Sequence, residues 1–201
     1  MDKNEKTKPD GLDDLLVDSL EVQFPIEGHS GATLRNLVNM LASKQKLIAK
    51  AFNINGVLLD ENFAQALNEK VICTTEDFTK AILDLGPDRS PGLSFDFENG
   101  TFTFKLAGGS FNSDKVTAFR DLAALMDNNA KILKHVSFKP AQEDNPKFAF
   151  RTWLTRLGMN GGEYKASRKA MLASLEGSSA FRKPQETNKK TLGSMELVEV
   201  E

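Results

Sequence analysis

The stretch LSFDFENGTFTFKLAG, residues 93–108, predicts a β-hairpin. Apolar and polar residues alternate on both sides of Asn99-Gly100, and this two-residue period is typical of half-buried strands. Asn-Gly between two such runs is the strongest short-range hairpin signal, because both residues tolerate the positive φ angles of a tight turn. The apolar positions are rich in Phe, so we expect one face of a Phe-rich hairpin to join the core.

A strand, a long helix and two shorter helices are predicted upstream of the hairpin. Residues 20–26 alternate apolar and polar, and Pro25, which has no N–H to donate, favours an edge position. Residues 32–52 place their apolar side chains three, four or seven apart, which gives one stripe along a long helix. The shorter helices are expected over residues 60–70 and 74–85, the second capped by Thr74 or Thr75.

A second long amphipathic helix is predicted over residues 111–136, with Ser113 or Asp114 as its cap. A shift of 85 residues superimposes the apolar positions of the first long helix on those of the second, as from 34 to 119 and from 37 to 122. Each helix follows a strand and a glycine-containing loop. We interpret this as a degenerate duplication of a strand-loop-helix unit. Chance alignment of two amphipathic helices is the alternative.

The expected fold is α+β and ends in a C-terminal helical pair over residues 146–157 and 162–176. The two strand-loop-long-helix repeats, over about residues 20–55 and 93–137, would pack with the hairpin and this pair on one core, as a single domain over 17–182. Residues 1–16 are predicted to be a disordered tail. Residues 183–201 are predicted to be a flexible tail, whose closing MELVEVE would pair as a strand only where an edge is offered.

The composition, with 40% hydrophobic and 27% charged residues among 201, is that of a soluble globular protein. No apolar run reaches the roughly 18 residues of a membrane span, and the charged N-terminus lacks the apolar region of a secretory signal. The one cysteine, Cys73, has no partner for an internal disulfide, so we expect a cytoplasmic protein.

Residues with catalytic or metal-binding chemistry are few. His29 falls in a loop and His135 late in a predicted helix, and neither has Cys, Asp or Glu at metal-ligand spacing, so a structural or surface role is favoured for each. Cys73 follows two apolar residues and is expected to be a small core residue. The loop AGGSFNSDK, residues 107–115, leads into a predicted helix N-terminus, where backbone N–H groups can hold an anion, but it lacks the spaced Gly-Lys-Ser/Thr of a phosphate loop, so a capping turn is favoured. We therefore expect no enzyme, no cofactor and no metal site.

The charge is unevenly distributed, although the formal net charge is only −2. Residues 1–30 carry eight acids and three bases, and residues 60–104 carry nine acids and three bases, whereas residues 147–183 carry eight bases and two acids. Such asymmetry suggests a polyanion-binding end. The candidate nucleic-acid-binding residues are Lys147, Arg151, Arg156, Lys165, Arg168 and Lys169.

Three interpretations of the basic C-terminal helical pair remain open. The first is a helix-turn-helix, for which Gly158 fits, but Leu154 is bulky where a small residue belongs and Ser167 is polar where an apolar one is expected. The second is a non-specific face that contacts phosphates. The third is a helical hairpin whose charges are solvated or offset by the acidic half of the molecule.

The run DNPKFAFRTWLTRLGMNGGEYKASRKAMLASLEGSSAFR, residues 144–182, resembles the C-terminal signature of a family found in Firmicutes genomes and labelled "virulence-related protein". That signature combines an Asn-x-Lys-Phe/Tyr-Ala-Phe-Arg run with Leu-x-Arg-Leu-Gly, Glu-Tyr-Lys, Arg-Lys and Ser-Ala-Phe, and all of these stand here. Residues 34–52 also resemble the family's upstream helix, so the resemblance covers about residues 20–182. It implies a small protein of mobile genetic elements and no established reaction.

Two functions from different classes are expected. The first is a non-enzymatic accessory protein of a mobile genetic element that binds nucleic acid non-specifically through the basic C-terminal helices. The alternative is a protein–protein interaction adaptor without nucleic-acid binding, in which the acidic half or the MELVEVE tail engages a partner. Salt dependence separates them, because phosphate contacts release counterions and adaptor contacts largely do not.

Overall fold

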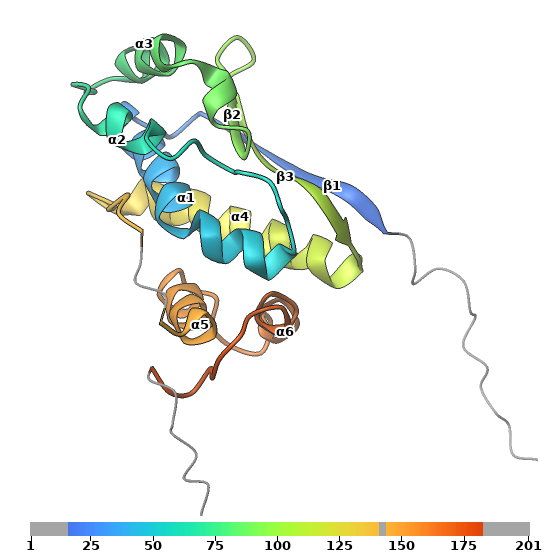
Figure 1. The fold of residues 1–201 in the computed structure, drawn as a ribbon. Helices are drawn as coiled ribbons and strands as arrows, with labels where there is room; N and C mark the ends of the chain where they lie inside the picture. Colours follow the sequence, from blue (N-terminus) through green and yellow to red (C-terminus); the bar gives the residue numbers. More distant parts are fainter. Residues whose placement is uncertain (1–15, 141–143, 183–201) are drawn as a thin grey trace, which may run out of the picture.

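A three-stranded antiparallel sheet forms one layer of the computed structural model, which describes residues 16–140 and 144–182 (Figure 1). Strand β3 (Thr101–Phe111) lies between β1 (Val17–Pro25) and β2 (Leu93–Asp96). The long helices α1 (Gly31–Phe52) and α4 (Ser113–Ile132) pack on each other beside this sheet. The predicted α+β class is confirmed.

The predicted hairpin forms, but its connection spans residues 97–100, and of Asn99-Gly100 only Gly100 has a positive φ. Leu93 pairs with Phe104 and Phe95 with Phe102, and Gly100 adopts a φ of 64° that a side chain would strain. The Asp96 carboxylate accepts hydrogen bonds from the backbone and side-chain N–H groups of Asn99, which fixes the turn. Strand β2 is shorter than the alternation indicated, because Phe97 already belongs to the turn.

Strand β1 lies at an edge of the sheet, as the proline near its end predicted. It pairs antiparallel with β3, with Leu20 opposite Leu106 and Phe24 opposite Phe102. Its other edge faces no strand among the described residues. The outward face of the sheet is polar, and there the Lys105 ammonium forms an exposed ion pair with the Glu21 carboxylate at 2.6 Å. Only one face of the sheet is therefore committed to the core.

The two strand-loop-long-helix units are present in the structure. Strand β1 leads into α1 and strand β3 leads into α4, and both the strands and the helices are neighbours. Among the described residues, strand β2 has no counterpart in the first unit. The arrangement of the two units is confirmed, whereas their origin by duplication stays a prediction.

The caps of the long helices differ from the sequence prediction in one case. Ser30 caps α1 in a reciprocal capping box with Thr33. Helix α4 is capped by the side chain of Asn112, which accepts from the Lys115 N–H, and not by Ser113 or Asp114. The predicted capping turn is thus present one residue earlier. Helix α4 also ends at Ile132, so His135 lies beyond it and not late within it.

Two short helices and a 3-10 turn cover the β2 end of the molecule. They are α2 (Phe63–Asn68), α3 (Thr75–Leu85) and the turn Pro87–Arg89. Thr74 caps α3 in a capping box with Asp77, as expected for one of the two threonines. The expectation that Cys73 is a core residue is wrong: its side chain is exposed, and the neighbouring Ile72 is buried instead, at 6% exposure.

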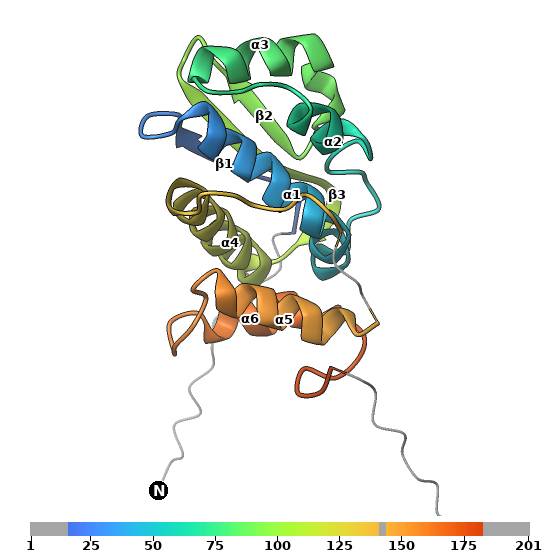
Figure 2. The same ribbon diagram turned by 90° about the vertical axis from the view of Figure 1, so that its left-hand side faces the viewer.

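The C-terminal pair forms a third layer, with α1 and α4 between it and the sheet (Figures 1 and 2). It consists of α5 (Pro146–Arg156) and α6 (Lys165–Ala173), the second being shorter than predicted. Phe150, Leu154 and Met171 are fully buried and belong to the same hydrophobic cluster as the residues of α1 and α4. No helix in the described part of the chain is long and apolar enough to cross a membrane. Most of the predicted N-terminal tail and the C-terminal tail with MELVEVE lie outside the described residues.

Candidate nucleic-acid interface

The basic residues predicted to meet nucleic acid lie on the third layer, and four of the six are well exposed. These four are Arg151 and Arg156 on α5 and Lys165 and Lys169 on α6. Lys147 on α5 and Arg168 on α6 are partly buried. Within α5 the residues 147 and 151, and within α6 the residues 165 and 169, are four apart, so each helix presents one pair of cations on one side.

The Arg168 side chain makes hydrogen bonds within the fold. Its guanidinium donates hydrogen bonds to the carbonyl oxygens of Met159 and Gly161, each at 2.9 Å. Met159 is fully buried, so these bonds fasten the connection between α5 and α6 to the start of α6. Charge-assisted hydrogen bonds of this kind are stronger than neutral ones. Arg168 is therefore the least suited of the six to a phosphate contact.

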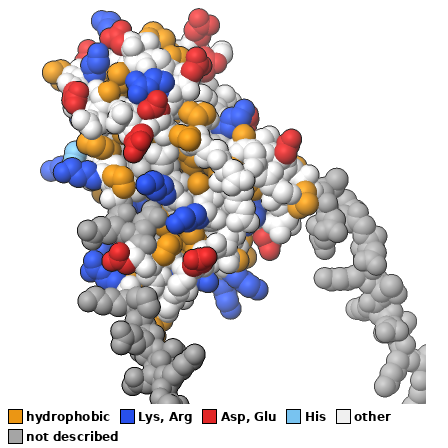
Figure 3. Space-filling view, viewed as in Figure 1, with side chains coloured by type: hydrophobic (Ala, Val, Ile, Leu, Met, Phe, Trp, Pro, Cys, Tyr) orange, Lys and Arg blue, Asp and Glu red, His pale blue; other side chains and the backbone are white. Residues whose placement is uncertain are grey.

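Acidic residues are few in the sequence of the C-terminal pair. Between residues 144 and 182 the chain has seven bases and three acids, the acids being Asp144, Glu163 and Glu176. None of the ion pairs found among residues 16–140 and 144–182 involves one of the six candidate cations. Figure 3 shows Lys and Arg side chains around the α5–α6 end together with some Asp or Glu. Within residues 16–140 and 144–182, the charge of the pair is thus not neutralised by direct ion pairing.

The geometry of the pair differs from a helix-turn-helix. Residues 157–164 separate α5 from α6, whereas that motif joins its helices by roughly three to four residues. Gly158 and Gly161 adopt φ angles of 93° and 74° in this longer connection. Ser167, at the position where the motif has an apolar residue, is buried and its hydroxyl lies 2.5 Å from the Asp121 carboxylate of α4. A groove-reading helix is thus disfavoured.

A cleft of about 300 Å³ adjoins α5 on the side of α1, and we call it the α5 cleft. Four α5 residues along one helical face form its floor, namely Ala149, Thr152, Trp153 and Arg156. The other lining residues are Lys44 of α1, Asp144 and Asn145 before α5, Phe148 at its start, and Arg182. Sequence reasoning singled out Arg156 for its charge but did not predict a cleft, because Lys44 and Arg182 are distant from it in the sequence.

Asn145 closes the end of the α5 cleft. Its side-chain oxygen caps α5 by accepting from the Phe148 N–H at 3.1 Å, and its amide donates to the carbonyls of Ser178 and Phe181. Gly177 adopts a φ of 99°, and a Cβ there would collide with the Asn145 side chain. The segment after α6 is thereby tied to the start of α5, which places Arg182 at the cleft.

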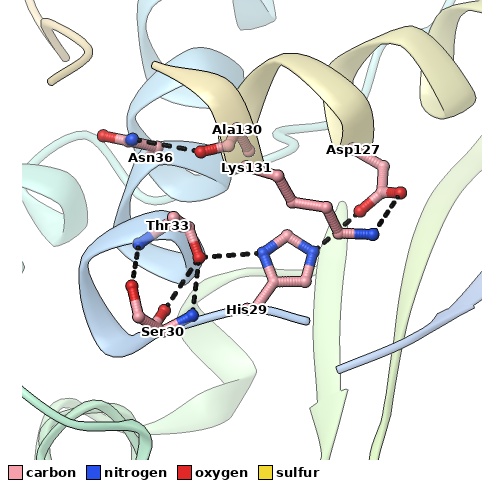
Figure 4. A network of polar contacts seen from close by, with 7 residues as sticks. All are labelled: His29, Ser30, Thr33, Asn36, Asp127, Ala130 and Lys131. Carbon is pink, nitrogen blue, oxygen red and sulfur yellow. Dashed lines mark hydrogen bonds and ion pairs between the residues drawn. The ribbon is translucent and has the colours of Figure 1, made fainter. Parts of the chain in front are cut away.

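His29 is a structural residue, and its contacts form the network of Figure 4. Its side chain is fully buried, with Nε2 2.8 Å from an Asp127 carboxylate oxygen and Nδ1 3.1 Å from the Thr33 hydroxyl. Because an ionised carboxylate only accepts, Nε2 carries a proton. Burial lowers the pKa of His29 below 6.5 despite Asp127, so the ring is neutral at neutral pH.

A hydroxyl, an imidazole and a carboxylate in line have the order of a hydrolase triad, but here the hydroxyl belongs to a helix cap. The Thr33 hydroxyl is held by the Ser30 backbone as part of the α1 cap, and the His29 ring packs edge-on against Phe102 at 5.5 Å. These contacts engage the Thr33 hydroxyl in the helix cap and hold the His29 ring between the cap and α4, so we assign both groups to the fold. No cluster of His, Cys, Asp and Glu in the described part of the chain has the geometry of a metal site.

Lys115 is a second partly buried polar residue whose contacts join separate helices. Its ammonium donates to the Ala51 carbonyl at the end of α1 and to the Ser174 hydroxyl at 3.2 Å, and it lies 5.3 Å from the centre of the Phe52 ring. Burial lowers the pKa of this lysine. The contacts join α4, α1 and the end of α6, so we assign Lys115 to the fold.

A larger groove lies beside the C-terminal half of α1, where Gln45, Lys46 and Ala49 face residues 56–61 and 88–91. Its volume is about 680 Å³, and its lining is mostly apolar, with Val57 exposed at 65%. Its charged lining residues are Lys46, Asp60, Glu61, Asp88 and Arg89. The Arg89 guanidinium lies 3.1 Å from the Asp60 carboxylate, which lowers the pKa of Asp60. This groove is the part of the acidic half that offers a partner an apolar surface.

Comparison with known protein families, with curated proteins and with solved structures finds no match for this chain. The resemblance of residues 144–182 to the "virulence-related protein" signature therefore stays a prediction.

Proposed function

We propose that this protein is a non-enzymatic accessory protein of a mobile genetic element that binds nucleic acid through the exposed cations of α5 and α6. The observation that carries the proposal is the set of Arg151, Arg156, Lys165 and Lys169, which are exposed and take part in no ion pair among the described residues. Such cations contact phosphates without reading bases, so binding would be non-specific in sequence. The mobile-element context is supported by the resemblance of residues 144–182 alone.

The experiment is a salt series of mobility-shift titrations with duplex and single-stranded DNA of mixed sequence. The double variant Lys165→Ala/Lys169→Ala should bind both more weakly, and about equally across sequences. The slope of log affinity against log salt should become shallower by roughly one for each lost contact. These residues are exposed, so the fold should not change.

A matched control removes the same charge at the other end of the molecule. Lys70→Ala/Lys80→Ala deletes two exposed cations near and within α3, and it should leave affinity and salt slope close to those of the wild type. If both double variants weaken binding alike, the cations of α6 have no special role and net charge explains the effect.

The adaptor function is the second candidate, and the 680 Å³ groove beside α1 favours it. If the wild type binds neither duplex nor single strand at low salt, the nucleic-acid proposal is wrong. The acidic half, with this groove, then becomes the surface on which a protein partner is to be sought.

A further inference from the structure

The α5 cleft combines aromatic side chains with cations, and it is large enough for one small ligand. Its volume of about 300 Å³ is at the lower end of the range for small-molecule sites, roughly 300–1,000 Å³. Trp153 and Phe148 supply aromatic surface, and the described lining residues include the guanidinium groups of Arg156 and Arg182 as well as the carboxylate of Asp144. Proteins that hold single-stranded nucleic acid combine these two features, a positive groove and aromatic stacking surfaces.

We propose that the α5 cleft binds one unpaired nucleotide of a single strand, with the base on Trp153 and its phosphate beside Arg156 and Arg182. We call the exposed cations of α5 and α6, namely Arg151, Arg156, Lys165 and Lys169, the basic face. The proposal rests on the proposed function and goes further, because it predicts a preference for single strands that the basic face alone does not give. In a duplex the base is stacked and paired, so its face is not available to the ring.

The floor of the cleft is arranged for a flat ligand. Trp153 is partly exposed, and its ring lies against the fully buried Phe150 ring at a centroid distance of 5.5 Å. Phe150 therefore supports the indole and limits its rotation. Ala149 and Thr152, four and one residues before the tryptophan, are small and leave space above the helix. A stacking surface that is already ordered costs less entropy when a base binds.

The polar groups at the rim suit the rest of a nucleotide. Arg156 is the last residue of α5, one turn beyond Thr152, and Arg182 follows the segment that Asn145 ties down. Guanidinium groups match phosphate oxygens in a bidentate geometry. The Asp144 carboxylate opposes an anion but accepts hydrogen bonds, and a base N–H group, such as N3–H of thymine, is a donor for it. A strand phosphate with its base fits this set better than a bare polyanion.

The chain contains a single tryptophan, so its fluorescence reports on the α5 cleft directly. The test is a titration of the full-length protein with three probes: a thymidine oligonucleotide, a mixed-sequence duplex of the same length, and inorganic polyphosphate. We expect the oligonucleotide to quench the emission of Trp153 and the other two to leave it nearly unchanged, although all three meet the basic face. Equal quenching by polyphosphate or duplex overturns the proposal.

Two variants separate the cleft from the basic face. Arg156→Ala should reduce affinity for the oligonucleotide more than for the duplex, whereas Lys165→Ala, on α6, should reduce both by a similar factor. Trp153→Leu should lower the affinity for the oligonucleotide roughly fivefold or more, since stacking contributes about 1–3 kcal/mol per base. If Trp153→Leu does not fold, two measurements still test the proposal. They are the quenching of wild-type fluorescence and the loss of oligonucleotide affinity relative to duplex affinity in Arg156→Ala.

The outcomes distinguish this proposal from the function on which it rests. Binding of all three probes without a change in Trp153 emission, and with equal losses in Arg156→Ala, removes the nucleotide site and leaves the non-specific basic face. If none of the three probes binds at low salt, both the nucleotide site and the proposed nucleic-acid-binding function are wrong.

Discussion

The hydroxyl of Ser167 on α6 lies 2.5 Å from the Asp121 carboxylate on α4, in a contact that joins the third layer to the second. Ser167 is only 2% exposed. A carboxylate accepts hydrogen bonds and cannot donate, so the serine is the donor. The polar residue that breaks the helix-turn-helix pattern thus has a reason in the fold: it hydrogen-bonds a carboxylate that the packing of α6 on α4 would otherwise leave poorly solvated.

Replacing Ser167 by Ala should lower the free energy of unfolding by about 1–3 kcal/mol, because it removes a charge-assisted hydrogen bond from a partly buried acceptor. The double variant Ser167→Ala/Asp121→Ala should recover part of this loss. Urea denaturation of the four proteins in the double-mutant cycle measures the coupling. Additive losses would show that the contact contributes nothing beyond its separate groups.

Arg168 is predicted to behave as a structural residue in spite of its charge. Arg168→Ala should lower the free energy of unfolding by about 1–3 kcal/mol, since the Met159 and Gly161 carbonyls lose charged donors. The neighbouring Lys169→Ala removes the same charge from an exposed position and should change stability by less than about 1 kcal/mol.

Thermal unfolding of the two variants beside the wild type makes this comparison. Nucleic-acid binding measured on Arg168→Ala is interpretable only if that variant proves fully folded. An Arg168→Ala protein as stable as Lys169→Ala contradicts the structural role and returns Arg168 to the phosphate-binding set.

Local signals account for the parts of the fold that the sequence predicts well. The turn at Asn99-Gly100, the cap at Thr74 and the edge position implied by Pro25 each depend on residues that are neighbours in the chain. Periodicity likewise places α1 and α4, because burial of one stripe needs no knowledge of what covers it. Boundaries are less certain: α4 ends at Ile132, before its apolar pattern does.

Long-range polar contacts account for what the sequence does not predict. His29 and Asp127 are 98 residues apart, and no spacing rule connects them. Asn36 is similar: it lies on the buried side of α1, and it bonds atoms 94 to 100 residues away. The α5 cleft likewise requires Lys44, Trp153 and Arg182 to meet. Charge asymmetry indicated the right end of the molecule but not the cleft.

Asn36 is predicted to be among the polar residues most important for stability. Its amide donates to the Ala130 and Leu133 carbonyls, and its oxygen accepts from the Val136 N–H, so one side chain holds the chain where it leaves α4. Asn36→Leu should lower the free energy of unfolding by about 2–3 kcal/mol, because three hydrogen bonds of a buried side chain are lost and the buried Ala130 carbonyl loses this donor.

The control is Asn62→Leu, at a position that is exposed and whose side chain makes no capping hydrogen bond. It should change stability little. Chemical denaturation compares the two, and hydrogen exchange at the Val136 N–H should accelerate in Asn36→Leu alone. Equal effects of the two substitutions would contradict the role assigned to Asn36.

The last prediction concerns the pH dependence of stability, which His29 should govern near neutral pH. Burial lowers the pKa of His29 in the folded protein, while in the unfolded chain it returns to about 6.5. The unfolded state then binds more protons as the pH falls. The contribution of neutral His29 to stability is thus complete above pH 6.5, and it is lost progressively as the pH falls from about 6.5 toward the lower folded-state pKa.

The two histidines of the chain allow a matched comparison. His135 is exposed, so His135→Gln should keep the wild-type decline in the free energy of unfolding between about pH 7.5 and 5.5, which is at most about 1.4 kcal/mol per pH unit for one proton. His29→Gln should be less stable at pH 7.5, because the contact with Asp127 is altered, but its curve should be flatter over this range. Urea denaturation of the three proteins at five pH values measures the slopes. Parallel curves for the wild type and His29→Gln would show that another group titrates, whereas a flat curve confined to His29→Gln would identify the buried imidazole between Thr33 and Asp127 as the source.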